Sequence, residues 1–178
     1  MVTTISVNEV KDKIRAIPDF PKEGIIFRDI TTGIKDGKTM QFMIDYLCDQ
    51  FKEFKIDYIA GIESRGFIFG MPMAYKLGCG FIPIRKPNKL PAETVSESYG
   101  LEYGTDTIEI HKDSIEKGAN VLVVDDLLAT GGTASAACNL VRRVGGNLVG
   151  AAFLIELNEL EGRKKLQDCG KVVSMLQY

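Results

Sequence analysis

The chain has 178 residues, with 22 Lys and Arg against 24 Asp and Glu, so its formal net charge is −2. Hydrophobic residues make up 45% of the sequence and charged residues 26%, which is typical of a globular domain and excludes a disordered chain. The longest apolar run, residues 148–155, is far shorter than the roughly 20 residues of a membrane-spanning helix. We therefore expect one domain over residues 1–178, with neither a membrane nor a nucleic acid as partner.

The four cysteines, Cys48, Cys79, Cys138 and Cys169, form no Cys-x-x-Cys pair, and the single histidine, His111, has no cysteine near it. A zinc site needs several such ligands at close spacing, so we expect none. Scattered cysteines in a chain of this size are typical of reduced, mostly buried thiols. The N-terminal residues also lack the features of a signal peptide. Both observations predict a cytoplasmic protein.

The N-terminal part of the chain combines two helical segments with an irregular one. Ser6 and Glu9 have the spacing of a capping box, which predicts a helix over residues 7–16. Residues 17–35 are rich in proline and glycine and are expected to be irregular. Residues 38–54 are expected to be helical because their apolar side chains recur with helical spacing. These side chains belong to Met40, Met43, Ile44, Leu47, Phe51 and Phe54.

The rest of the chain alternates expected strands with expected helices. The strands fall at residues 58–62, 80–85, 121–124, 148–155 and 171–176, and the helices at 66–77, 134–144 and 159–167. This alternation implies right-handed βαβ units, and so an α/β fold with a parallel twisted sheet flanked by helices. Residues 86–110 contain prolines, glycines and many charges, which favours a mobile loop or an exposed hairpin.

Two nucleotide-binding motifs can be set aside. Residues 33–39 look like a P-loop, but three residues separate the two glycines where the motif needs four. We interpret this segment as a turn with Asp36 near the N-cap of the following helix. The dinucleotide fingerprint Gly-x-Gly-x-x-Gly follows none of the expected strands, so NAD or FAD binding has no support.

The most informative segment is VLVVDDLLATGGT, residues 121–133. Its strand brings Asp125 and Asp126 to the carboxyl edge of the sheet, where open α/β sheets bind ligands. The following turn, residues 129–133, can direct backbone N–H groups and two hydroxyls at an anion beside a helix N-terminus. Because carboxylates repel phosphate, we expect the two acids to bind sugar hydroxyls or to hold Mg²⁺ through water. This predicts a phosphorylated ribose; the alternative is a strand end with solvated acids and a capped helix.

These thirteen residues resemble the 5-phosphoribosyl-1-pyrophosphate (PRPP) signature of type I phosphoribosyltransferases. Further segments resemble the adenine-specific members of that family: FRDI at 27–30, ESRGF at 63–67, IRK at 84–86, KLP at 89–91, SYGLEYG at 98–104 and LQY at 176–178. The resemblance runs from about residue 20 to the C-terminus. It implies a phosphoribosyltransferase fold with a flexible hood loop, roughly residues 86–110, over the site. It also implies transfer of the phosphoribosyl group of PRPP to N9 of adenine in purine salvage, giving AMP and pyrophosphate.

The resemblance also assigns the PRPP-binding residues. The 5′-phosphate is assigned to a loop of five residues: Ala129, Thr130, Gly131, Gly132 and Thr133. The ribose hydroxyls are assigned to Asp125 and Asp126. Pyrophosphate is assigned to Arg65, as a catalytic residue, and to Arg85, Lys86 and Lys89. A surface ion pair at Arg65 and a solvated basic face at the other three cations are the alternatives.

The remaining roles implied by the resemblance concern adenine. Glu102 resembles the general acid/base near adenine N7, a role that suits a carboxylate whose pKa is raised by desolvation. Tyr103 would shape the site. Phe27 resembles the residue that stacks on adenine, while backbone groups of Ile26 and Arg28 would bind the edge of the base. The alternatives are a solvent-facing hairpin acid at Glu102, a core residue at Phe27 and simple packing at Tyr103.

The loop before the helix at 66–77 carries two further expectations. The resemblance implies a cis peptide between Glu63 and Ser64, although related enzymes often have Asp rather than Glu at position 63. It also implies Mg²⁺ held by PRPP and water, with no metal ligand assigned directly, and a homodimer.

Three other functions stay open at this point. The first is transfer to a 6-oxopurine or to xanthine. The second is a PRPP-sensing regulator, which would carry a DNA-binding segment, although the residues before Asp36 show no helix-turn-helix pattern. The third is a PRPP synthetase, which would need an ATP site.

Overall fold

The computed structural model describes residues 5–100 and 104–178. The chain divides into two compact units, Met1–Tyr46 and Leu47–Tyr178. The positions of Glu102 and Tyr103 lie outside the described residues. Within these two ranges, no helix has the length and apolar character needed to cross a membrane.

The N-terminal unit begins with helix α1 (Val7–Lys13), whose capping box is confirmed because Ser6 Oγ accepts from the Glu9 backbone at 3.3 Å. The helix is shorter than predicted, because Arg15–Pro18 forms strand β1 and pairs antiparallel with β2 (Ile26–Asp29). The irregular segment expected over 17–35 therefore contains a hairpin and the short helix α2 (Thr31–Ile34). The missed strands are only four residues long and strand propensity carries little signal over so short a run.

Helix α3 (Gly37–Asp49) begins in the first unit and ends in the second. Asp36 Oδ1 accepts from the Thr39 backbone at 2.8 Å, which confirms that Asp36 lies at the N-cap of the following helix, although the turn is confined to residues 35–36 between α2 and α3. The predicted continuation to residue 54 is wrong. The Phe51 backbone bonds to the Cys48 carbonyl, three residues back, so the chain leaves the helix through turns and Phe54 lies exposed beyond it.

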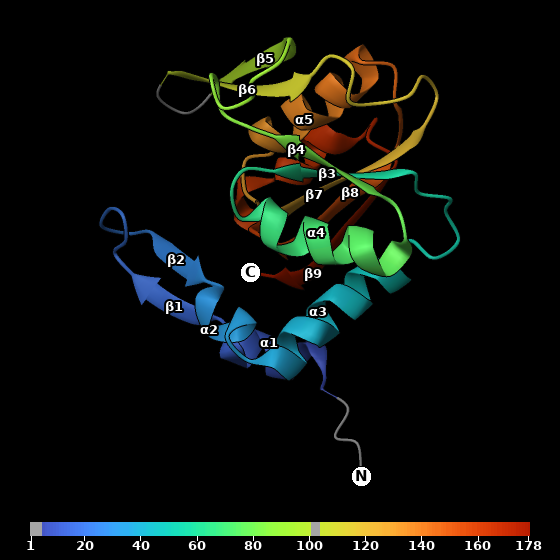
Figure 1. Ribbon diagram of the computed structural model, residues 1–178. Helices are drawn as coiled ribbons and strands as arrows, with labels where there is room; N and C mark the ends of the chain where they lie inside the picture. The colour runs from blue at the N-terminus through green and yellow to red at the C-terminus, as the bar shows by residue number, and fades with distance from the viewer. Residues whose placement is uncertain (1–4, 101–103) are drawn as a thin grey trace. The chain divides into compact units, whose positions relative to one another are not determined.

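The C-terminal unit contains a five-stranded sheet in the order β4-β3-β7-β8-β9, with every neighbouring pair parallel. Its strands are β3 (Tyr58–Ile62), β4 (Gly80–Ile84), β7 (Asn120–Leu128), β8 (Asn147–Glu156) and β9 (Lys171–Gln177). Helices α4 (Gly66–Leu77) and α5 (Gly132–Arg143) lie on opposite faces of this sheet (Figure 1). The predicted α/β class, with a parallel sheet flanked by helices, is confirmed.

The helix predicted at 159–167 is wrong in type. The structure has two short 3₁₀ helices there, η1 (Asn158–Leu160) and η2 (Gly162–Leu166). Glu161 between them has φ +50°, a left-handed conformation that interrupts an α-helix.

Strand β7 is longer than the predicted 121–124, so Asp125 and Asp126 lie within the strand rather than after it. The pairing explains the difference. Strand β3 pairs with β7 only as far as Gly61 and Val124, whereas β8 pairs with it as far as Leu128. The last residues of β7 therefore keep strand geometry through their pairing with β8, although β3 no longer pairs with them on the other side.

The region expected to be a loop or hairpin contains a hairpin, made of β5 (Thr94–Gly100) and β6 (Thr105–His111). It lies beside α5, at the top of Figure 1. Tyr99 and Val95 of β5 pack against the core cluster that α5 forms with the sheet.

The four cysteines are all free thiols, and Cys48, Cys138 and Cys169 are buried, as the sequence predicted.

Candidate functional site

Three neighbouring strands end at the same edge of the sheet. Because β4, β3 and β7 are adjacent and parallel, the residues that follow them meet there: Arg85 after β4, Glu63 after β3 and Ala129 after β7. This is the edge at which open α/β sheets bind ligands. The structure thus brings the predicted phosphate, ribose and pyrophosphate residues to one side of the C-terminal unit.

The predicted phosphate loop, residues 129–133, connects β7 to α5 and lines a cavity of about 70 Å³. Gly131 is the N-cap residue of α5 and has φ +78°, which favours glycine. The first backbone N–H groups of the helix have no partner four residues earlier in the chain. The loop therefore presents hydrogen-bond donors and the positive end of the helix dipole to an anion.

Gly162, in the segment between β8 and β9, supports this loop and was missed by the sequence analysis. A Cβ on Gly162 would lie 2.1 Å from the Ala129 carbonyl oxygen, and one on Gly131 would lie 2.3 Å from the Gly162 oxygen. Each glycine lets the two backbones touch. A lone glycine inside a segment expected to be helical was the available signal.

The paired acids lie in the second half of β7, near its carboxyl end. Asp126 is only 4% exposed, and its Oδ2 lies 2.9 Å from Nε of Arg65. Asp125 Oδ1 accepts from the Asp126 backbone at 2.8 Å. Burial raises the pKa of both carboxyl groups; repulsion from Asp126 adds to the effect at Asp125, while Arg65 opposes it at Asp126.

Arg65 reaches Asp126 because α4 begins directly against β7. A Cβ on Gly66, the first residue of α4, would lie 2.6 Å from the Val124 carbonyl oxygen, so only glycine permits this approach. The peptide between Glu63 and Ser64 is cis, as expected. The alternative of an ion pair at Arg65 holds in part: the pair is present and the Arg65 side chain is 37% exposed, but the Asp126 side chain is only 5% exposed, so it is not a pair between two surface groups.

Two of the three cations after β4, Arg85 and Lys86, pair with carboxylates, whereas Lys89 is exposed as the solvated alternative expects. Glu63 accepts two bonds from Arg85, at 3.1 Å from Nε and 2.9 Å from Nη2, and one from the Lys86 backbone at 3.0 Å. The bonds from Arg85 lower the pKa of Glu63. Arg85 also donates to the Lys89 carbonyl at 3.1 Å, while Lys89 itself is exposed.

Lys86 points to the hairpin, where two residues that the sequence analysis did not assign hold it. Its ammonium donates to Asp106 Oδ2, which also accepts from the Tyr99 hydroxyl at 3.0 Å. The bond from Lys86 lowers the pKa of Asp106. Sequence separation hid this contact, since Asp106 lies 20 residues from Lys86.

The predicted adenine-binding residues belong to the N-terminal unit. Ile26, Phe27 and Arg28 lie on β2; Ile26 is exposed, and the Phe27 ring packs edge-to-face on Phe20 at 5.2 Å between centroids. Phe27 is only half-buried, so it is not the core residue that the alternative expects.

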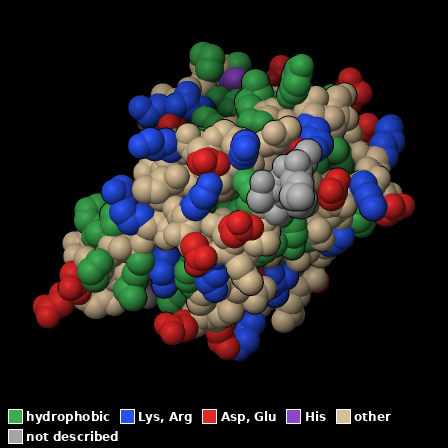
Figure 2. Space-filling model, turned by 90° about the horizontal axis from the view of Figure 1, so that it is seen from below, with side chains coloured by type: hydrophobic (Ala, Val, Ile, Leu, Met, Phe, Trp, Pro, Cys, Tyr) green, Lys and Arg blue, Asp and Glu red, His purple; other side chains and the backbone are tan. Residues whose placement is uncertain are grey.

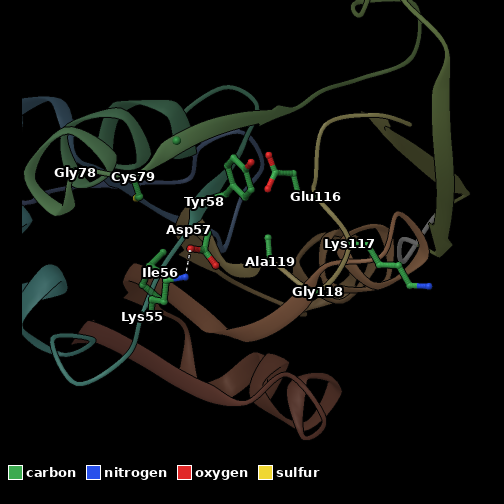
Figure 3. Close-up of a pocket in the computed structure, with 11 residues that line it drawn as sticks. Lys55, Ile56, Asp57, Tyr58, Gly78, Cys79, Glu116, Lys117, Gly118 and Ala119 are labelled. Carbon is green, nitrogen blue, oxygen red and sulfur yellow. Dashed lines mark ion pairs between the residues drawn. The ribbon is translucent and has the colours of Figure 1, made fainter.

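A larger cavity of about 690 Å³ lies at the opposite edge of the sheet, near the amino ends of β3 and β4 (Figure 3). Its charged residues serve local structure: Lys55 pairs with Asp57 at 3.1 Å, and Asp57 accepts from the Asn120 backbone at 2.8 Å. None of the motif residues lines it. On the face drawn in Figure 2, basic and acidic side chains are interspersed rather than gathered by sign.

A parallel sheet with a glycine-containing loop and paired acids at its carboxyl edge is the arrangement expected of a type I phosphoribosyltransferase. A family model described as "Phosphoribosyl transferase domain" matches residues 33–177. The adenine phosphoribosyltransferase of Trichodesmium erythraeum is 57% identical over 170 residues, covering 96% of this chain and 99% of the relative. That of Nostoc punctiforme is 55% identical over 172 residues, with 96% and 99% covered.

Solved structures agree. A crystal structure of adenine phosphoribosyltransferase from Thermoanaerobacter pseudethanolicus is 51% identical, with a TM-score of 0.94 over 97% of this chain and 100% of that one. The enzyme of Saccharomyces cerevisiae, complexed with an imino-altritol bisphosphate and adenine, is 44% identical with a TM-score of 0.90, covering 96% and 98%. This chain belongs to the adenine phosphoribosyltransferase family, whose reaction converts adenine and PRPP to AMP and pyrophosphate.

Proposed function

We propose that the carboxyl edge of the sheet binds PRPP and that this site carries out the family's reaction on N9 of adenine. The observation that carries the proposal is the phosphate loop. Residues 129–133 are fixed by Gly162 at the N-terminus of α5, which suits the dianionic 5′-phosphate. The ribose hydroxyls then fall to Asp125 and Asp126, since carboxylates accept hydrogen bonds from hydroxyls and repel phosphate.

Pyrophosphate, the leaving group, is proposed to bind Arg65, Arg85, Lys86 and Lys89. All four follow β3 or β4 at the same edge as the phosphate loop. A cation placed where negative charge develops lowers the barrier to bond cleavage, and Arg65 has the catalytic role in this proposal. The ion pair with Asp126 orients its guanidinium beside the ribose acids.

The adenine roles are proposed from sequence resemblance alone. Glu102 would exchange a proton at adenine N7 while N9 attacks C1′ of the ribose, and Tyr103 would shape the site. Phe27 would stack on the base, with backbone groups of Ile26 and Arg28 at its edge. The half-buried Phe27 ring supports this proposal, because a stacking residue needs an accessible face.

Mg²⁺ is the proposed cofactor. No group of three or more potential metal-ligating side chains occurs in the part of the chain that the structure describes. The donor set still fits, because Mg²⁺ is usually bound by one or two carboxylates together with substrate phosphates and water. Asp125 and Asp126 would supply the carboxylates, without a direct ligand being assigned, and the ion would neutralise the charge of the departing pyrophosphate.

We further propose a single functional domain, a homodimer and a cytoplasmic location. The match of one family model to residues 33–177 supports the single domain. Met71 and Tyr75, four residues apart on α4, are 56% and 92% exposed, and an apolar pair of this kind supports association with a second copy. The four free thiols support a reducing compartment. Light scattering coupled to size-exclusion chromatography tests the dimer.

The experiment that tests the function is product formation from PRPP and Mg²⁺ with adenine, hypoxanthine, guanine and xanthine in parallel. We expect AMP from adenine and no nucleotide from the other bases. Product from a 6-oxopurine would retain the site and overturn the base assignment. PRPP binding without any product would instead favour a regulator.

A further inference from the structure

The contact between Lys86 and the hairpin is more specific than a surface ion pair. Asp106 on β6 lies directly opposite Tyr99 on β5 in the hairpin register. One oxygen of Asp106 accepts from both the Lys86 ammonium and the Tyr99 hydroxyl, while the other accepts from the Thr107 backbone at 2.8 Å. The Lys86 ammonium also lies 3.5 Å from the Tyr99 hydroxyl and 6.0 Å from the centre of its ring. The carboxylate is thus fixed, and it aims Lys86 at the hairpin.

The same hairpin touches the phosphate loop. A Cβ on Gly132, the first residue of α5, would lie 3.1 Å from Cδ2 of Tyr99 and 3.4 Å from the Gly100 carbonyl oxygen. Tyr99 therefore contacts Lys86 through its hydroxyl and the phosphate loop through its ring. The group that holds Lys86 sits beside the proposed PRPP site.

The ion pair between Lys86 and Asp106 is exposed enough for another anion to replace the carboxylate. The Lys86 and Asp106 side chains are 42% and 31% exposed, so water screens their attraction and the pair contributes little to stability. A pyrophosphate oxygen can replace such a carboxylate, since charge-assisted bonds from an ammonium form equally well to either acceptor. A fully buried pair could not be broken at so small a cost.

We propose that Asp106 is a positioning residue that competes with pyrophosphate for Lys86. In the ligand-free enzyme the Asp106 carboxylate binds the Lys86 ammonium against the hairpin. When pyrophosphate binds, its oxygens replace the carboxylate as the acceptor for Lys86. This inference rests on the proposed role of Lys86 in pyrophosphate binding. It predicts that loss of the Asp106 charge tightens pyrophosphate binding, whereas damage to the hairpin would weaken it.

Asp106→Asn tests the proposal because the amide keeps the shape of the side chain and an oxygen for the Thr107 backbone. The probe is inorganic pyrophosphate with Mg²⁺, titrated into the full-length enzyme by calorimetry. We expect binding about threefold tighter than in the wild type, the size of a partly exposed ion pair, and a lower KM for PRPP. Asp106→Glu restores the charge and should bring both values back toward the wild type. Glu93→Gln is the matched control, since it removes an exposed carboxylate that pairs with Lys112 at 2.8 Å beside the same hairpin.

A double-mutant cycle separates this inference from the proposed function. In a Lys86→Met background, Asp106→Asn should leave pyrophosphate affinity unchanged, because the competing cation is gone. If Lys86→Met weakens pyrophosphate binding but Asp106→Asn weakens it too or has no effect, the competition is overturned and the role of Lys86 stands. If Lys86→Met leaves the affinity unchanged, the proposed pyrophosphate role of Lys86 fails, and this inference with it.

Discussion

Gly162 provides a sharp test of how the phosphate loop is held, because it is outside the loop yet fixes its backbone. In Gly162→Ala the new Cβ would lie 2.1 Å from the Ala129 oxygen, 3.0 Å from the Ala129 carbon and 2.8 Å from the Gly131 nitrogen. Non-bonded heavy atoms favour separations of about 3.5–4.0 Å. Since all three atoms belong to the backbone, no side-chain rotation can relieve the overlap.

The backbones must therefore separate by about 1 Å or more. Forced overpacking of this kind costs about 1–3 kcal/mol of unfolding free energy. Misplacement of a substrate-binding group by about 1 Å can lower the rate by as much as 10²-fold. We expect kcat/KM for PRPP to fall by about 10- to 100-fold, with PRPP affinity carrying most of the loss.

The assay is calorimetric PRPP binding together with steady-state kinetics and urea unfolding. Gly170→Ala is the matched control: Gly170 has φ +73°, and a Cβ there would lie 2.3 Å from the Val149 oxygen. Gly170 precedes β9, at the opposite edge of the sheet, so this variant should lose stability and keep PRPP affinity. Equal PRPP affinities in Gly162→Ala and the wild type would refute the argument that Gly162 shapes the loop.

Three further predictions address the acids. Asp125→Asn should weaken PRPP binding by about 10- to 100-fold, as expected for loss of hydrogen bonds to a charged group; unchanged affinity in calorimetry would remove its ribose role. Glu102→Leu should lower kcat by about 10²- to 10⁴-fold with little change in PRPP affinity, and normal turnover would contradict its acid/base role. Bonds from Thr31 and then Arg15 lower the pKa of Asp29 from 3.8 to about 2. Because the folded pKa is depressed, this stabilisation is present above about pH 4 and is lost as the pH falls through about 2. Asp29→Asn should cost about 1–2 kcal/mol in urea unfolding at pH 7, and a difference that persists at pH 2 would be inconsistent with this origin.

The parallel sheet and its helices could be predicted because their patterns are long and local. Helix α4 begins and ends at the predicted residues, closed by Gly78 in a left-handed conformation. The errors fall where tertiary contacts decide the local structure. Strand β7 extends to Leu128 because β8 continues to pair with it, and such pairing is not visible in a local apolar pattern. The 3₁₀ segment around Gly162 packs against a loop some 30 residues earlier in the chain.

In the site too, residues within one local motif could be predicted from the sequence, whereas contacts between distant segments could not. Residues 121–133 could be assigned from sequence because strand, acids and loop are contiguous, so the motif contains its own geometry. Partners that come from distant segments could not. Nothing in the sequence indicates that Asp106 accepts a hydrogen bond from Lys86. Nor does it indicate that Glu63 accepts hydrogen bonds from both the Arg85 side chain and the Lys86 backbone. These contacts depend on which strands are adjacent at the sheet edge and on where the hairpin packs.

Charge balance at this edge links the observed pairs to the proposed chemistry. Three pairs in the described part of the C-terminal unit each join a cation assigned to pyrophosphate to a carboxylate: Arg65 to Asp126, Arg85 to Glu63 and Lys86 to Asp106. Without these acids the clustered cations would repel one another, and the apo site would lose stability. At these three cations, an incoming anion must therefore displace a carboxylate before it can bind. Since a displaced acid needs a new cation, the Mg²⁺ proposed to enter with PRPP would offset the charge of the paired acids, of which Asp126 is more buried than Glu63 or Asp106. The least buried pairs exchange at the lowest cost, and so the Lys86 pair with Asp106 is the natural place to detect that exchange.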